Sequence, residues 1–190
     1  MILPIVAYGH PTLKKVAVDI SPDFPQLDKL IEDMWETMYN ATGIGLAAPQ
    51  VNQSIRLFVI DATPYADEMP QAKDFKKVFI NAKIEKMNDP EVIMNEGCLS
   101  IPGLSEEVPR KDSILIRYCD EAFVEHEEKY EGFIARVIQH EYDHIDGVLY
   151  VDRLPAFRKL LLKGKLKDIS EGKVDADYRM LFPSIRRKQR

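Results

Sequence analysis

Long apolar runs, paired cysteines and targeting signals are all missing from this sequence of 190 residues. No apolar stretch approaches the roughly 20 residues that a membrane-spanning helix needs. The two cysteines, Cys98 and Cys119, lie in unlike surroundings, which excludes a disulfide scaffold and favours reduced thiols. The first residues lack a basic segment and include Pro4, so neither a secretory signal nor a transit peptide is expected. These absences predict a cytoplasmic protein.

The composition that remains is that of an ordinary globular domain, with 45% hydrophobic and 30% charged residues. A chain of this length can bury a sufficient core by itself, so we expect residues 1–190 to form one domain. Charge is unevenly distributed, because residues 153–190 hold 12 Lys and Arg against 4 Asp and Glu while the whole chain carries a net charge of −5. We predict a basic C-terminal helix and tail over 155–190, which is either a solvated surface or a contact for an anionic partner such as RNA.

Hydrophobic periodicity predicts helices on both sides of a group of strands. Apolar residues at helical spacing predict helices over 25–42, from Gly132 onward, and over 155–169. Two glycines and a proline make 43–50 a shaped loop. The expected fold class is α+β, with mixed or antiparallel strands packed around the helix that begins at Gly132. The predicted strands are 55–60, 77–80, 92–94, 113–118 and 123–130.

The helix predicted from Gly132 contains the segment His140-Glu-Tyr-Asp-His144. Two histidines four residues apart project from one face of a helix, so both imidazoles can bind one ion. Glu141 lies one helical step away and can act as a general base toward water at that ion. The pattern predicts a catalytic metal site, although a histidine on a helix is more often a packed or solvated side chain.

A catalytic site of this kind needs a third protein ligand. The third histidine that some metalloproteases carry beyond the helix is missing here, and residues 148–170 contain no glutamate. Cys98 is the remaining candidate, because a thiolate is a strong ligand and Gly97 allows an unusual backbone angle or a close approach. A lone cysteine more often serves as a small buried hydrophobic residue, and we expect Cys119 to have that role.

Three separated motifs resemble those of the peptide deformylase family and occur in the family's order. The similarity extends over most of the chain, from His10-Pro-Thr-Leu to the helix after Gln139. It implies a hydrolase that removes the N-terminal formyl group from formyl-methionyl nascent peptides and releases formate. The motifs are Gly43-Ile-Gly-Leu-Ala-Ala-Pro-Gln50, Glu96-Gly-Cys-Leu-Ser100 and His140-Glu-Tyr-Asp-His144.

The same resemblance implies roles for individual residues. The metal ligands would be Cys98, His140 and His144. Glu141 would be the acid and base, while the Gln50 side-chain amide and the Leu99 backbone N–H would stabilise the oxyanion.

Further residues resemble the family's substrate-binding and supporting groups. The backbone at Ile44 and Gly45 would pair with the substrate peptide as an added strand. Arg136 departs from the family pattern, in which this position is usually apolar. The methionine pocket would include Met94, Phe133 and Val137, and a charge pair of Glu96 and Arg110 would lie behind the site and orient a metal-bound histidine.

One divalent ion is implied, Fe²⁺ in the cell, although two imidazoles and a thiolate also suit Zn²⁺, Ni²⁺ and Co²⁺ in purified protein. The implied partners are formyl-methionyl nascent peptides and, for residues 155–190, the phosphate-rich ribosome. No DNA and no membrane partner is implied. Two alternatives remain: a zinc endopeptidase whose third ligand is not evident, and a non-catalytic metal-stabilised binding module in which Glu141 is only a surface carboxylate.

Overall fold

The computed structural model describes residues 1–183 of the chain. Within that range, no helix combines the length and the apolar character that crossing a membrane requires. Short 3₁₀ turns at Pro11–Lys14, Ala48–Val51, Thr63–Tyr65, Pro70–Ala72 and Tyr150–Arg153 connect the regular elements. These elements are β1 (Ile5–Val6), α1 (Leu27–Asn40), β2 (Gly45–Ala47), β3 (Leu57–Asp61), β4 (Lys76–Cys98), β5 (Ile101–Cys119), β6 (Glu125–Glu131), α2 (Gly132–Ile145), α3 (Ala156–Ser170) and β7 (Met180–Leu181).

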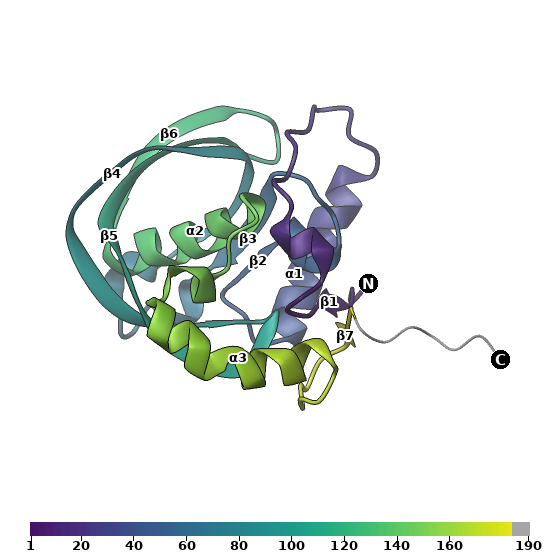
Figure 1. Ribbon diagram of the computed structural model, residues 1–190. Coiled ribbons are helices and arrows are strands. Elements are labelled where there is room, and N and C mark those ends of the chain that lie inside the picture. Colours follow the sequence, from purple (N-terminus) through teal and green to yellow (C-terminus); the bar gives the residue numbers. More distant parts are fainter. Residues whose placement is uncertain (184–190) are drawn as a thin grey trace.

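The main sheet is antiparallel, with the strand order β2-β3-β4-β5-β6. Its long β4–β5 hairpin curves around α2, so the helix lies inside the sheet (Figure 1). A separate pair of short parallel strands, β1 and β7, joins the two ends of the described chain. The arrangement confirms the α+β prediction of mixed and antiparallel strands around a central helix.

Strand β3, which lies between β2 and β4, is buried on both sides, and its side chains alternate between two cores. Phe58 and Ile60 pack in the core that includes α2, whereas Leu57 and Val59 pack in the core that includes α1. This alternation follows from the two-residue period of a strand. Because β3 contacts helices on both faces, it fixes α2 against the sheet and gives the side chains of that helix a rigid base.

Three strand predictions were too short, and one of them, 113–118, covers only the last part of β5, Ile101–Cys119. The segments 77–80 and 92–94 belong to one continuous strand, β4. The intervening residues are mostly exposed, and Pro90 and several register shifts interrupt the hydrophobic alternation on which the prediction depended. A hairpin that projects from the core can therefore keep its backbone ladder without a readable side-chain pattern.

The prediction that 43–50 is only a loop was also wrong in part. This segment contains the edge strand β2 and begins the 3₁₀ turn at Ala48–Val51. An edge strand pairs on one side only, so glycine is tolerated there. Its outer edge faces the functional site described next.

Candidate active site and metal centre

The three predicted metal ligands meet between the end of β4 and the middle of α2. Cys98 is the last residue of β4, and His140 and His144 lie one turn apart on α2. Their candidate ligand atoms all lie within 4.8 Å of one another, and the Cys98 Sγ is 3.3 Å from the His144 Nε2. One thiolate and two imidazoles form a donor set that suits a divalent transition-metal ion, so the residues present fit the implied metal.

Glu141 lies beside this cluster with an unsatisfied oxygen. Its side chain is 4% exposed, and its Oε2 has no hydrogen-bond partner among residues 1–183. Burial raises the pKa of Glu141 to about 7. Buried polar atoms are nearly always paired in native proteins, so an unpaired carboxylate oxygen next to the three candidate ligands makes Glu141 a candidate acid or base.

Gly45 explains how the Glu141 carboxylate reaches this position. A Cβ at residue 45 would lie 2.7 Å from the Cδ of Glu141, which is closer than real Cβ contacts allow. A side chain at residue 45 would therefore force the Glu141 carboxylate to move, whereas glycine lets β2 run against it. The glycine in the motif is required by close approach rather than by a positive φ.

Gln50 is held with its amide directed at the cysteine ligand. Its Oε1 accepts a hydrogen bond from the Ala47 backbone N–H at 2.8 Å, which fixes which end of the amide carries the donors. The Nε2 then lies 3.5 Å from the Cys98 Sγ and 3.3 Å from the Ser100 Oγ. Leu99 follows Cys98 directly in the turn between β4 and β5. The structure thus brings Gln50 and Leu99 next to the ligands.

Glu96 and Arg110 form the expected pair behind the site. The guanidinium of Arg110 donates to both oxygens of Glu96, at 2.7 and 2.9 Å. Burial opposes the ionised form of Glu96, but Arg110 and His140 outweigh it and hold the pKa of that carboxyl well below its usual range. The Glu96 Oε2 is 2.9 Å from the His140 Nδ1. This contact orients the ring so that its Nε2 faces Cys98.

The sequence analysis missed how far this charge network extends. Arg136, noted only as a departure from the family pattern, is buried and donates to the Glu96 Oε1 at 2.8 Å and to the Val108 carbonyl at 2.7 Å. Asp143, which was not singled out, accepts from Arg110 at 2.7 Å. The sequence contained an indication of this network, because a charged residue such as Arg136 on the apolar face of a helix needs a buried partner of opposite charge.

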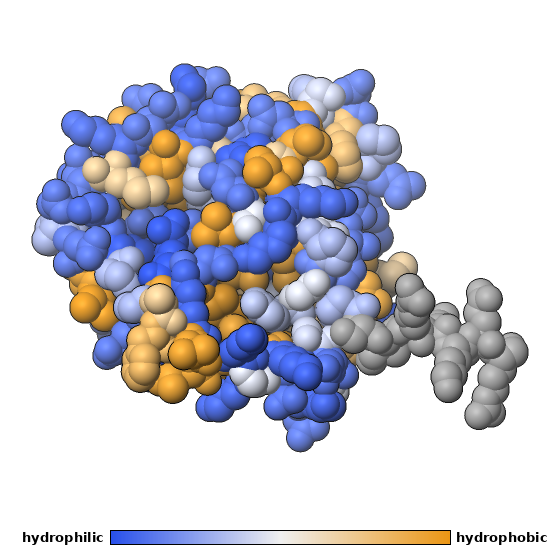
Figure 2. Space-filling view, viewed as in Figure 1, coloured by the Kyte–Doolittle hydropathy of each residue, from blue (hydrophilic) through white to orange (hydrophobic). Residues whose placement is uncertain are grey.

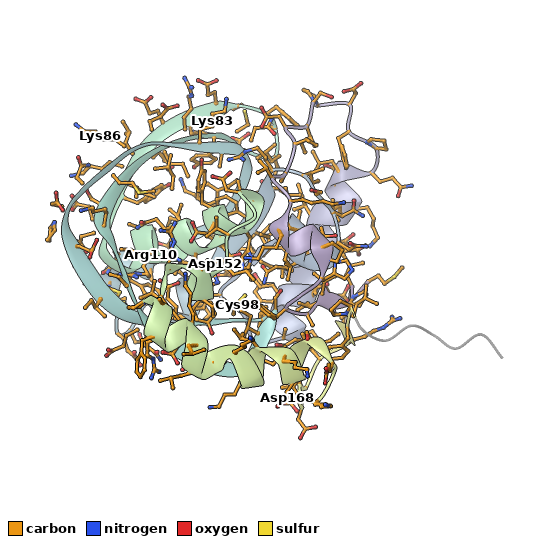
Figure 3. All side chains as sticks on the ribbon, viewed as in Figure 1. Lys83, Lys86, Cys98, Arg110, Asp152 and Asp168 are labelled. Carbon is orange, nitrogen blue, oxygen red and sulfur yellow. The ribbon has the colours of Figure 1, made fainter. Side chains whose placement is uncertain are left out.

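A cavity of about 610 Å³ opens onto the cluster. In Figure 3 the labelled Cys98 lies near the centre of the molecule, whereas Lys83 and Lys86 of the hairpin point outward. The cavity walls include four of the five predicted substrate-binding residues, Ile44, Gly45, Phe133 and Val137.

Met94 is the predicted pocket residue that does not line the cavity. It is half-buried on β4, where it pairs with Val108. The part of β4 that lines the cavity begins at the next residue, Asn95, so Met94 lies just outside the cavity wall. An unpredicted segment, Asp175–Tyr178, lines the cavity instead. No motif marks this segment, since it lies far along the chain from all three motifs.

Comparison with known proteins decides the family. Residues 2–159 match the family model described as polypeptide deformylase. The chain belongs to the peptide deformylase family. It is 54% identical to the peptide deformylase of Flavobacterium johnsoniae, over 98% of this chain and 99% of the relative. It is also 54% identical to that of Cytophaga hutchinsonii, over 96% and 98%.

Solved deformylase structures share the fold. The crystal structure of the peptide deformylase from Thermus thermophilus matches with a TM-score of 0.79 and 40% identity, covering 90% of this chain and 99% of that one. Deformylases are metal-dependent hydrolases that remove the N-terminal formyl group of nascent peptides, and the three-motif resemblance is confirmed. The zinc endopeptidase alternative finds no support among these deformylase relatives.

Proposed function

We propose that this chain deformylates nascent peptides with Glu141 as its acid and base and with Cys98, His140 and His144 as ligands of one divalent ion. The observation that carries the proposal is the buried Oε2 of Glu141, unpaired among residues 1–183, in a cavity that Cys98 and His140 of the Cys-His-His cluster also line. When bound, the ion supplies Lewis acidity that makes water a stronger nucleophile at neutral pH.

The protein's own groups account for the proton transfers. Glu141 takes a proton from the attacking water and passes it to the leaving amine, a task for which a pKa of about 7 is well suited. Negative charge develops on the formyl oxygen as the water adds. The Gln50 Nε2, fixed by the Ala47 N–H, and the Leu99 N–H are the donors we assign to that oxygen.

Substrate peptide is proposed to extend the sheet at β2. The Ile44 carbonyl already accepts a hydrogen bond from the Asp61 N–H at 2.8 Å. Because bonding directions alternate along an antiparallel strand, the backbone groups of Gly45 face the open edge and are the ones we assign to the peptide. Backbone pairing ignores side-chain identity, which suits an enzyme that acts on many nascent chains.

The methionine side chain is proposed to enter the apolar part of the cavity, next to Phe133 and Val137. A related deformylase from Acinetobacter baumannii, 31% identical with a TM-score of 0.73, has been solved with Met-Ala-Ser bound. A peptide that begins with methionine is thus a ligand of a protein with the same fold.

We assign Fe²⁺ as the ion in the cell, because a thiolate and two imidazoles bind it readily, while Zn²⁺, Ni²⁺ or Co²⁺ can replace it after purification. Since ferrous iron next to a thiolate is sensitive to oxygen, we expect protein prepared without oxygen to lose activity on aerobic storage. Equal activity before and after storage would contradict the iron assignment.

Residues 155–190 are proposed to contact ribosomes in the cytoplasm. Figure 2 shows a hydrophobic patch over α3, where Phe157, Leu160 and Leu161 are exposed beside several lysines. The last basic residues, 184–190, lie outside the described part of the chain. Co-sedimentation with ribosomes should weaken with salt and with the double variant Lys159→Glu/Lys163→Glu. Binding that neither salt nor these substitutions change would contradict the contact.

We also propose that residues 1–190 act as one catalytic domain. The pairing of β1 with β7 joins the start of the chain to residues beyond α3, and Asp175–Tyr178 lines the same cavity as the three motifs. A chain cut after residue 159, where the family match ends, should therefore lose activity.

Formate release tests the proposed function directly. Anaerobically prepared protein loaded with Fe²⁺ should release formate from formyl-Met-Ala-Ser and should spare the acetylated peptide. Glu141→Gln should keep its metal and lose the activity. No formate from a sample with verified metal content would overturn the proposal and reopen the binding-module alternative.

A further inference from the structure

The chain beyond α3 forms a C-terminal arm, defined here as residues 171–182, and Asp175–Tyr178 of this arm line the cavity. At its start, the Lys173 N–H donates to the Asp168 carbonyl at 2.9 Å. At its end, the Ile5 N–H donates to the Arg179 carbonyl and the Ala7 N–H to the Leu181 carbonyl, both at 2.9 Å. Figure 1 shows this yellow segment beside β1. Because both ends are tied to the body of the protein, the arm holds Tyr178 at a fixed place.

Tyr178 makes a direct contact with the residue that follows the cysteine ligand. Its hydroxyl donates a hydrogen bond to the Leu99 carbonyl at 2.8 Å. Burial raises the pKa of Tyr178 to about 12, so the phenol keeps its proton at every physiological pH. The contact is therefore a permanent donor–acceptor pair.

Leu99 needs such a contact because the strand ladder does not hold it. The register of β4 and β5 shifts between Gly97 and Cys98, and Leu99 lies in the tight turn that follows. Its side chain packs against Gly43, where an added Cβ would meet the Leu99 Cδ1 at 2.8 Å. Gly43 thus fixes the side chain, and Tyr178 fixes the carbonyl. The Leu99 N–H belongs to the preceding peptide unit, so holding the side chain and the carbonyl acts on it by limiting the backbone rotation at the Leu99 Cα.

The next residue in the turn is held in the same manner. The Ser100 carbonyl accepts a hydrogen bond from the Tyr8 N–H at 2.8 Å, and the Ser100 Oγ lies 3.3 Å from the Gln50 Nε2. Contacts from both ends of the described chain therefore set the turn that carries one of the two oxyanion donors assigned above. Neither the strands nor the metal-ligand helix supplies these contacts.

We propose that Tyr178 is a positioning residue for deformylation, which acts by holding the Leu99 carbonyl and thereby limiting the backbone rotation that sets the direction of the Leu99 N–H toward the developing oxyanion. The inference rests on the proposed role of Leu99. Tyr178 lies beyond the residues that match the family model, which end at 159, so the arm adds a wall and a support to the shared site. A group that acts only as negative charge develops affects kcat and leaves substrate binding unchanged.

The test is Tyr178→Phe, which removes the hydroxyl and keeps the packed ring. The matched control is Tyr39→Phe, because the Tyr39 hydroxyl donates to Asp61 at 2.6 Å and does not line the cavity. With formyl-Met-Ala-Ser, we expect Tyr178→Phe to lower kcat about three- to tenfold, as loss of one hydrogen bond that aligns a donor would do. KM should stay within about twofold, and Tyr39→Phe should match the parent in both constants.

The melting temperatures of both variants are measured, and the activity assay is run well below the lower of the two. A fall in kcat under these conditions reflects positioning and not a loss of folded protein. An unchanged kcat for Tyr178→Phe would overturn the proposal, and so would a raised KM at constant kcat, since that result would assign the hydroxyl to substrate binding. A fall in kcat that Tyr39→Phe shares would assign it to general stability. If the parent itself releases no formate, the proposed function fails and the role of Tyr178 fails with it, whereas an active parent with an unchanged Tyr178→Phe overturns the role of Tyr178 alone.

Discussion

The cavity has two walls of opposite character. The inner wall, α2, is almost completely buried and carries two of the proposed metal ligands, Glu141 and a share of the charge network. The outer wall, the C-terminal arm, alternates exposed and half-buried residues and reaches the site through one phenol. The proposed reacting groups therefore lie on α2, whose side chains are held from several directions. The C-terminal arm contributes by holding a single backbone turn.

The inner wall is held by buried charged side chains, each of which would destabilise the fold without a partner of opposite charge. Glu96 and Arg110 are both buried, and Arg110 donates to Glu96 and to Asp143. Breaking such a pair by removing one partner typically costs about 3–5 kcal/mol, because it leaves an uncompensated buried charge. The network therefore acts as a rigid frame behind His140. The outer wall has no comparable frame among the described residues.

The largest effect is expected at the inner wall, from Glu141→Gln. Removing the acid and base should lower kcat by about 10²–10⁴. The folded-state pKa of Glu141 is raised to about 7, so in the metal-free protein its ionised form weakens the fold progressively as the pH rises through that value. At pH 8 in a chelator, the melting temperature of Glu141→Gln should equal or exceed that of the parent. A marked fall would mean that Glu141 supports the fold rather than the reaction.

Glu96→Gln tests whether the charge network behind the inner wall orients His140. The amide keeps the shape of the carboxylate but weakens the contact with His140, which lies 2.9 Å away. Loss of such a supporting group typically lowers metal affinity about 10–100-fold, and competition with a chelator measures it. Asp120→Asn is the control, because that carboxylate contacts a different histidine, His126, at 2.8 Å on the surface. Equal metal affinity in both variants would contradict the orienting role.

Gly45→Ala tests the close approach of β2 to the inner wall. The added methyl group would displace the Glu141 carboxylate, so we expect kcat to fall at least about tenfold, because small misplacements of a catalytic group are costly. Gly103→Ala is a control for the loss of a glycine, since no atom lies within 4 Å of its added Cβ, although its positive φ adds local strain. Full activity of Gly45→Ala would show that Glu141 can move without loss.

The smallest effect is expected from Lys173→Ala, at the start of the C-terminal arm. Lys173 lies 2.6 Å from Glu171 in an exposed ion pair. Such pairs contribute roughly 0–1 kcal/mol, so Lys173→Ala should leave formate release unchanged and shift the melting temperature by no more than a few degrees. A loss of activity comparable to that of Tyr178→Phe would show that the arm is positioned by this pair and not by its pairing with β1.

Prediction from the sequence worked best where structure is local. The helix predicted over 25–42 is α1, Leu27–Asn40, because one buried face at helical spacing is sufficient to define it. The helix predicted from Gly132 is α2, Gly132–Ile145, for the same reason. The long hairpin was predicted in fragments because its residues outside the core need no alternation of apolar and polar side chains. Met94 was wrongly placed in the pocket because closeness to Cys98 in the sequence does not show which residues of an extended strand line a cavity.

The sequence by itself determined the pair of histidines on one helix face, since backbone geometry brings residues i and i+4 together in any α-helix. Only the tertiary structure decided which residues complete the site. Cys98 meets the histidines across the sheet, Gly45 leaves room for Glu141, and Tyr178 reaches Leu99 from the far end of the chain. These contacts depend on how a curved sheet packs around α2, and no spacing along the chain encodes that packing.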